Sequence, residues 1–285
     1  MTSWTIPSAD GSEIVGYELG GAGDVLLIAH ATGLCGPMYQ QLADELTANF
    51  RVVAFDFRGH GRSSNGADID VSWYRMADDV SAVVEHLGVG QVHAFGHSMG
   101  GATLLLAELN KPGTFCSLYL FEPIVFPDGY PSDGQNVMSA AARRRRPDFG
   151  SRAEVLYRYA SRPPFNSLQA GVLAGYVDNG FADDADGRVR LCCLPENEAL
   201  VFEAGRHVTW AGLEGLAVPT MVGAGHDDGH PTPALLAPPL AAALQGGQFV
   251  RYDNVGHFGP LQDPWTIARD IRHHGVTSRA VISGR

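Results

Sequence analysis

Ser98 lies in a pattern of residues that is typical of a nucleophilic serine. The stretch Gly96-His97-Ser98-Met99-Gly100 has the spacing G-x-S-x-G, directly after a predicted strand and directly before a predicted helix. A sharp turn from strand to helix strains the backbone at the serine and lifts its hydroxyl clear of the sheet, over a helix N-terminus that favours negative charge. The two glycines lack a Cβ, so neighbouring backbone can pack against the turn. We therefore expect Ser98 to be a catalytic nucleophile.

Such a turn needs a strand and a helix to position it, and the chain alternates between the two. Short apolar runs bounded by turn residues predict buried strands. They cover residues 25–29, 51–55, 92–95, 116–121, 220–223 and 248–252. Segments with helical spacing cover residues 38–46, 72–87, 99–109, 238–244 and 265–273. This order predicts an α/β fold with one doubly wound, mostly parallel sheet.

The alternation stops in the middle of the chain. Residues 126–210 are rich in charges, prolines and aromatic side chains. We expect this segment to be a helical cap, inserted into an α/β core formed by residues 1–125 and 211–285, at the carboxyl edge of the sheet. Several of its aromatic residues are expected to line an apolar substrate pocket, and the others to form the cap's own core. These aromatic residues are Tyr130, Tyr157, Tyr159, Phe165, Tyr176, Phe181 and Phe202.

With the serine turn, the strand order and the insertion taken together, the sequence resembles the α/β-hydrolase superfamily, and within it the ester-hydrolase-like branch. The resemblance covers about residues 25–123 and 218–276, which is nearly the whole core, but it does not extend to the cap. It implies the α/β-hydrolase fold and a catalytic triad in the chain order serine, acid, histidine.

The resemblance also identifies two backbone groups for an oxyanion hole. His30-Ala31-Thr32-Gly33 follows the first buried strand and resembles the family's His-Gly loop, although Ala31 stands where glycine is usual. It implies the backbone N–H of Thr32 as one donor and that of Met99, next to the nucleophile, as the other. Loss of one such donor typically lowers the rate by ~10²–10³.

The base and the acid are implied by the loops after the later strands. Val255-Gly256-His257-Phe258 follows the last predicted strand, where the family has its catalytic histidine. An imidazole, with an ordinary pKa of about 6.5, can take the serine proton near neutral pH. For the acid, an ungapped match of the loop after residues 220–223 points to Asp228. Asp227 takes the role if that loop is one residue shorter, and Glu122 follows the fourth strand, a place that some family members use.

Two further polar segments have structural and functional interpretations. Residues 56–63 resemble a loop that is widespread in the superfamily, and we interpret them as a structural turn because buried charged groups are usually paired. Arg143–Arg146 form a run of four arginines in the cap. We interpret this run as the solvated face of a cap helix. The alternative is a clamp for an anionic substrate, since guanidinium groups bind carboxylate and phosphate well.

The composition argues against several classes of function. The chain has 285 residues, 45% hydrophobic and 18% charged, as in a globular protein, and its net charge of -11 opposes binding to nucleic acid or to an anionic membrane. The first residues lack the features of a signal peptide, and no apolar run approaches the ~20 residues that span a bilayer. The four cysteines match no zinc-site spacing. We expect a cytoplasmic protein with a small-molecule substrate and with neither metal nor cofactor, and the sequence leaves its oligomeric state open.

These expectations converge on hydrolysis of a carboxylic ester, lactone or thioester of a small apolar molecule, through an acyl-enzyme on Ser98. In relatives the same triad supports C–C bond hydrolysis and cofactor-free perhydrolysis, which are the alternatives, because a fold does not determine its chemistry. The alternative from another class is a non-catalytic binding protein that keeps the pocket. The complete set of Ser98, Asp228 and His257 argues against it.

Overall fold

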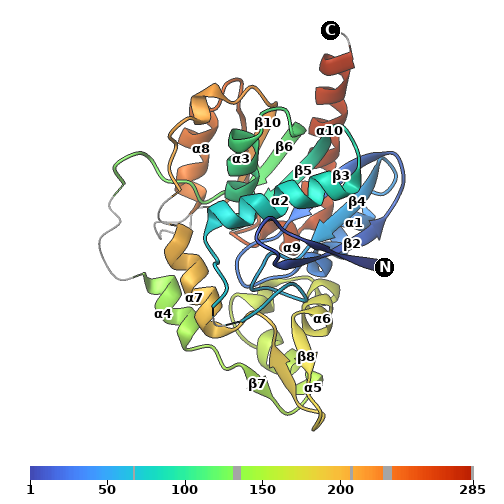
Figure 1. Ribbon diagram of the computed structural model, residues 1–285, viewed down its shortest axis with the longest axis vertical. Coiled ribbons are helices and arrows are strands. Elements are labelled where there is room, and N and C mark those ends of the chain that lie inside the picture. Colours follow the sequence, from blue (N-terminus) through green and yellow to red (C-terminus); the bar gives the residue numbers. More distant parts are fainter. Residues whose placement is uncertain (67, 131–135, 206–207, 227–232, 284–285) are drawn as a thin grey trace.

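The computed structural model describes residues 1–66, 68–130, 136–205, 208–226 and 233–283. At its centre is an eight-stranded sheet with the order β1-β2-β4-β3-β5-β6-β10-β11 (Figure 1). The strands are β1 (Thr2–Pro7), β2 (Glu13–Gly20), β3 (Asp24–Ala29), β4 (Phe50–Phe55), β5 (Val92–His97), β6 (Phe115–Phe121), β10 (Thr220–Gly225) and β11 (Gln248–Tyr252). From β4 to β11 neighbouring strands are parallel, whereas β1 and β2 are antiparallel at one edge.

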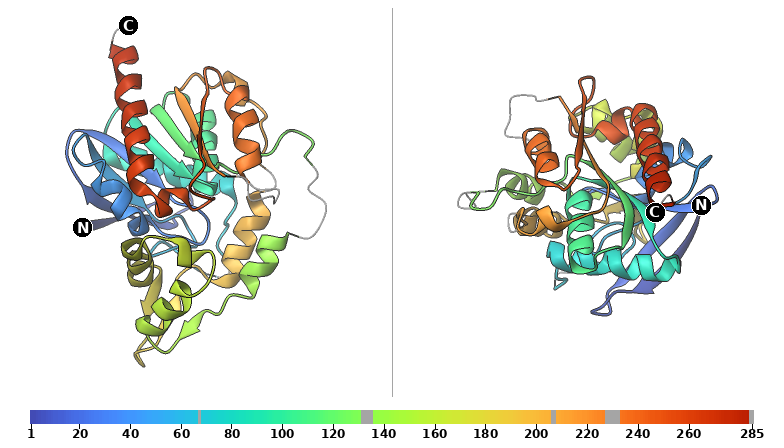
Figure 2. Two further views of the ribbon diagram at one scale, coloured as in Figure 1. Left: turned by 180° about the vertical axis from the view of Figure 1, so that it is seen from behind. Right: turned by 90° about the horizontal axis from the view of Figure 1, so that it is seen from above.

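Helices cover both faces of this sheet, as Figure 2 shows. One face carries α2 (Trp73–Leu87), α3 (Met99–Asn110) and α8 (Pro233–Ala243), and the other carries η1 (Gly36–Tyr39), α1 (Gln40–Asp44), α9 (Gly259–Gln262) and α10 (Pro264–Ser283). Side chains of β3 alternate between the two cores: Leu27 packs with α2 and α3, and Ile28 packs with α1 and α10. This arrangement confirms the predicted α/β fold with a doubly wound, mostly parallel sheet.

The hairpin of β1 and β2 is absent from the sequence prediction. Most residues of β1 are exposed or half-buried, with only Ile6 buried, so the strand lacks the apolar run that predicts a central strand. The Trp4 ring lies across Gly16 of β2, where a Cβ would come within 2.0 Å of it. Gly16 therefore leaves room for the Trp4 ring of the edge strand β1 to lie over β2.

Between β6 and β10 the chain forms an inserted segment, seen at one end of the sheet in Figure 1, which we call the cap. Its helices are α4 (Val137–Arg143), α5 (Arg152–Ala160), η2 (Phe165–Ser167), α6 (Ala170–Asn179) and α7 (Pro195–Ala204), and η4 (Leu213–Gly215) follows it. A small antiparallel sheet, β7-β9-β8, joins them; its strands are β7 (Asp148–Phe149), β8 (Phe181–Asp183) and β9 (Val189–Leu191). The inserted segment is helical, as expected. The small sheet was not predicted because strands of two or three residues carry no period-two signal.

The cap is hydrogen-bonded to loops at the carboxyl ends of the strands. Tyr176 Oη of α6 donates to the carbonyl of Gly33, after β3, at 3.2 Å, and Gln169 N–H donates to the carbonyl of Leu261, beyond β11, at 3.1 Å. The space above these strand ends is therefore enclosed by core and cap together. In the part of the chain that the structure describes, no helix is long and apolar enough to cross a membrane.

Candidate active site

Ser98 occupies the strained turn that its motif predicts. Its backbone has φ 55° and ψ -117°, a positive φ that side chains rarely adopt, between the end of β5 and the start of α3. A Cβ on Gly96 would lie 2.6 Å from Gly101 Cα, and one on Gly100 would lie 2.2 Å from the carbonyl oxygen of Ala29. The flanking glycines are therefore required by close backbone packing. The neighbouring strand β6 also holds the turn, since Ser98 N–H donates to the carbonyl of Phe121 at 2.9 Å.

His257 is hydrogen-bonded to a buried carboxylate. Its Nδ1 lies 2.6 Å from Glu122 Oε2, and Glu122 Oε1 accepts the backbone N–H of Gly225 at 2.8 Å. Glu122 is 1% exposed and follows β6 directly, with φ 44°. Among the described residues, Ser98 and Glu122 are the two non-glycine residues with positive φ. Such backbone strain clusters at functional sites.

This contact revises the expected acid. In a triad the acid binds the imidazole Nδ1–H, and in this structure that position is occupied by Glu122. Asp228, the residue that the loop match favoured, and Asp227 lie outside the described residues. Glu122 can reach the site because β6 is the immediate neighbour of β5, which ends beside Ser98, and His97 is in register with Phe121. The geometry therefore favours Glu122, the third candidate from the sequence.

The two expected oxyanion donors are at the ends of β3 and β5. Met99 is the first residue of α3, so its N–H has no carbonyl one turn earlier to bind. Thr32 lies in the loop after β3, and its neighbours are held on both sides. Ala31 N–H donates to Tyr39 Oη at 3.3 Å, and Gly33 N–H donates to His60 Nε2 at 3.0 Å. These bonds hold the loop although Ala31 replaces the usual glycine.

His97, next to the nucleophile, links the base loop to the oxyanion loop. Its Nε2–H donates to the carbonyl oxygen of His257 at 2.8 Å, and its Nδ1 accepts from Tyr39 Oη at 2.7 Å. Tyr39 Oη is also the group that accepts Ala31 N–H. Burial holds the pKa of His97 well below its ordinary value, so the ring is neutral. The interpretation of His97 as structural fits these contacts, which sequence reasoning did not identify individually.

Residues 56–63 form the structural turn that the sequence predicts. The Arg58 guanidinium is fully buried and binds Asp79, with Nη2 2.6 Å from Oδ1, and Asp10. Asp56 accepts the backbone N–H of Gly36 at 2.7 Å. Burial lowers the pKa of His60 to about 4. These polar groups are therefore paired with one another and with the backbone. Among the described residues, no group of three or more His, Cys, Asp or Glu side chains is placed to hold a metal ion.

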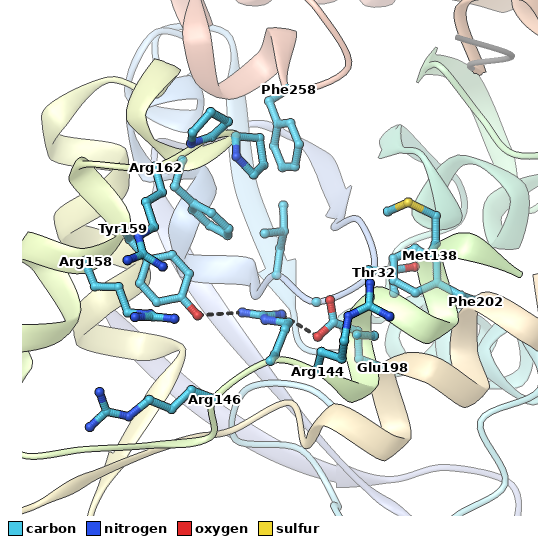
Figure 3. A pocket seen from close by; sticks show the side chains of 18 residues that line it. Thr32, Met138, Arg144, Arg146, Arg158, Tyr159, Arg162, Glu198, Phe202 and Phe258 are labelled. Atoms are coloured by element: carbon cyan, nitrogen blue, oxygen red, sulfur yellow. Dashed lines mark hydrogen bonds and ion pairs between the residues drawn. The ribbon is translucent and has the colours of Figure 1, made fainter.

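A cavity of about 430 Å³ lies between the cap and the core loops (Figure 3). It is bounded on the core side by Thr32 of the oxyanion loop and by Phe258, next to His257. Three of the cap aromatics predicted to line a pocket do so: Tyr159, Phe165 and Phe202. Of the others, Tyr176 and Phe181 are buried in the cap, and Tyr130 and Tyr157 are exposed. Its size and largely apolar lining suit a small molecule.

The run Arg143–Arg146 does not form one solvated face. Arg143 is exposed and binds Glu196 at 2.7 Å, as that interpretation predicts. Arg145 turns inward: its guanidinium binds Glu198 and donates to Tyr176 Oη at 2.8 Å. Together with Arg144 and Arg146, Arg145 lines the cavity. The solvated-face interpretation is therefore wrong for part of the run.

Comparison with known proteins agrees with this fold. Residues 25–268 match the model of a family described as the alpha/beta hydrolase family. A bifunctional esterase/perhydrolase of Acinetobacter calcoaceticus is 29% identical over 243 residues, 79% of this chain and 82% of its own. Among solved structures, a thermophilic esterase from Thermogutta terrifontis has a TM-score of 0.74 at 23% identity, over 98% of this chain and 99% of its own. An E-2-(acetamidomethylene)succinate hydrolase has a TM-score of 0.79 at 20% identity, over 96% and 98%. Because the family model spans most of the sequence, the chain belongs to the alpha/beta hydrolase family.

Proposed function

We propose that the protein hydrolyses a carboxylic ester through an acyl-enzyme on Ser98. The observation that carries this proposal is the 2.6 Å bond between Glu122 and His257, at the same sheet edge as the strained turn at Ser98. Glu122 keeps the proton of the imidazole on Nδ1, which leaves Nε2 to take the Ser98 proton as the hydroxyl attacks the carbonyl carbon. The backbone N–H groups of Thr32 and Met99 then stabilise the oxyanion.

The same groups complete the turnover. The imidazolium gives its proton to the leaving alcohol, and the C–O bond to the alcohol breaks. Water, deprotonated by His257, then attacks the acyl-enzyme and releases the acid and free Ser98. The names of the similar esterases support an ester as substrate, and the name of the Acinetobacter relative supports perhydrolysis, with peroxide in place of water, as the alternative.

Turnover of 4-nitrophenyl acetate and butyrate tests this proposal. We expect wild-type protein to release nitrophenol, and Ser98→Ala to lower kcat by ~10⁴–10⁶ while remaining folded. Ser3→Ala, a substitution of an exposed serine on β1, is the matched control and should retain full activity. Activity that survives in Ser98→Ala would contradict the nucleophile. A folded wild-type protein that turned over neither ester would contradict the esterase proposal.

A further inference from the structure

The cavity is more basic than the rest of the molecule. Five arginines line it, Arg144, Arg145, Arg146, Arg158 and Arg162, whereas Glu198 is the single acidic residue among its described lining. The whole chain has a net charge of -11, so this local positive charge opposes the overall balance. A cation-lined cavity on an acidic protein concentrates anions at that place.

Two of the five guanidinium groups are neutralised within the protein. Arg145 binds Glu198, which is itself 6% exposed. Arg146 binds Glu154 of α5 at 2.8 Å and lies over the Phe149 ring. These two arginines therefore hold the cap together and leave little charge for a ligand.

The other three form no ion pair among the described residues, although the charge of Arg158 contributes, after the backbone N–H of Gly150, to holding the pKa of Glu154 below its ordinary value. Within the described ranges, no carboxylate lies within 4 Å of Arg144, Arg158 or Arg162. Glu154, one turn before Arg158 on α5, is engaged by Arg146 and by the backbone N–H of Gly150. Figure 3 shows Arg158 and Arg162 on one side of the cavity and Arg144 on the other. Arg158 lies in the last turn of α5 and Arg162 lies two residues beyond this helix, so two like charges without an ion pair are on the same side of the cavity, where an anion would reduce their mutual repulsion.

We propose that the substrate is an ester carrying a free anionic group, a carboxylate or a phosphate, which binds between Arg158, Arg162 and Arg144. A guanidinium donates two parallel hydrogen bonds to such a group, which suits it to this role. The apolar side chains of Leu34 and Phe165 would then contact the hydrocarbon part of the substrate. The ester carbonyl would lie by Thr32, on the core side of the cavity. This inference rests on the proposed function and specifies its substrate class.

Two esters of matched length test the proposal: 4-nitrophenyl hydrogen glutarate, which has a free carboxylate, and 4-nitrophenyl pentanoate, which has none. We expect wild-type kcat/KM to be higher for the glutarate ester by ~10-fold or more, the size of one charge-assisted hydrogen bond. In the double variant Arg158→Gln/Arg162→Gln this preference should disappear, while kcat/KM for the pentanoate ester changes by less than ~3-fold. Arg190→Gln, which removes an exposed arginine of β9 bound to Asp148, is the matched control and should keep the preference.

The outcomes separate the inference from the proposed function. Equal turnover of the two esters by wild type, or an unchanged preference in the double variant, would overturn the inference and leave the esterase proposal intact. If neither ester is turned over, the esterase proposal fails, and calorimetric titration still tests the anion site. Glutarate or inorganic phosphate should bind wild type at least ~10-fold more tightly than the double variant, and the tighter of the two identifies the anion. Equal binding, or no binding to wild type, would contradict the site.

Discussion

The core side and the cap side of the cavity differ in how their polar and charged side chains are paired. On the core side, His30, His60 and His97 are fully buried, and every ring nitrogen of the three has a protein partner. On the cap side, Arg144 and Arg162 are exposed and line the cavity, and in the described part of the chain no carboxylate lies within 4 Å of either guanidinium. Satisfied neutral groups hold backbone in place, whereas unpaired cations provide binding energy for an anion. We therefore expect the core to carry out the chemistry and the cap to select the substrate.

The strongest test of the core side is the acid. We expect Glu122→Gln to lower kcat by ~10⁴, because an amide in place of the carboxylate favours the wrong imidazole tautomer. Asp228→Asn is the matched control and should lose ~10-fold or less, the small effect expected of a charge outside the triad. Steady-state kinetics with 4-nitrophenyl butyrate measures both. Reversal of the two results would place the acid after β10.

The next largest effect is a loss of stability expected where the cap contacts the core. Arg145 and Glu198 form a largely buried ion pair beside Gly33, where a Cβ would come within 2.6 Å of Glu198 Oε1. Arg145→Gln leaves Glu198 without its counter-charge, and we expect it to lower the free energy of unfolding by about 3 kcal/mol. The double variant Arg145→Gln/Glu198→Gln should recover most of this loss. Urea denaturation measures both, and a double variant no more stable than the single one would show that the pair does not account for the cost.

A smaller effect should appear as pH dependence on the core side. Burial lowers the pKa of His60 from 6.5 to about 4 in the folded protein. Between these values the unfolded chain binds the proton and the folded protein does not. The stability that depends on neutral His60 is therefore present above pH 6.5 and is lost as the pH falls toward 4.

The stability difference between wild type and His60→Gln reports this linkage. As the pH falls through that window, wild type should lose up to about 1.4 kcal/mol of stability per pH unit relative to His60→Gln. Urea denaturation of both proteins at pH values from 7.5 down to about 4.5 measures it. Parallel curves for the two proteins would mean that His60 does not carry the linkage.

The smallest expected effect is that of the link between the two core loops. Tyr39→Phe removes the hydroxyl that joins Ala31 N–H to His97 Nδ1. We expect kcat to fall by ~10-fold with a smaller change in KM, because the Thr32 donor and the His257 loop lose alignment while the cavity keeps its shape. Tyr119→Phe is the control, since that buried hydroxyl binds Tyr252 and Asp270 lies beyond it. Equal loss in the two variants would indicate a general packing effect.

The residues that the sequence predicts are those positioned by backbone topology. The sequence predicts Ser98 from the G-x-S-x-G motif between a strand and a helix, and the resemblance to the family implies His257 from the Gly-His pair after the last strand. The acid was harder to predict. Two loops at the same sheet edge offer carboxylates, and only the three-dimensional arrangement shows that Glu122 reaches Nδ1.

In the cap, by contrast, the sequence does not predict the environments of the arginine side chains. Only Arg143 belongs to α4, and Arg144–Arg146 follow the end of the helix, so the four adjacent arginines do not lie on one helix face and do not share one environment. Arg143 faces Glu196 and Arg145 faces Glu198 because α7 packs beside α4, which the sequence pattern of this segment does not reveal. The sequence does not identify Arg158 and Arg162 as cavity residues, because Arg158 on α5 and Arg162 just beyond it are separated along the chain from the run of four arginines.

The central claim is that Glu122 and His257 activate Ser98, and labelling with a fluorophosphonate probe tests it most directly. Peptide mapping by mass spectrometry should place the label on Ser98. The labelling rate should fall by ~10²-fold or more in both variants, because His257→Ala removes the base and Glu122→Gln favours the imidazole tautomer that cannot accept the serine proton. It should stay unchanged in Arg158→Gln/Arg162→Gln with a neutral probe. A label on another serine, or a rate at Ser98 that is indifferent to Glu122, would contradict the account.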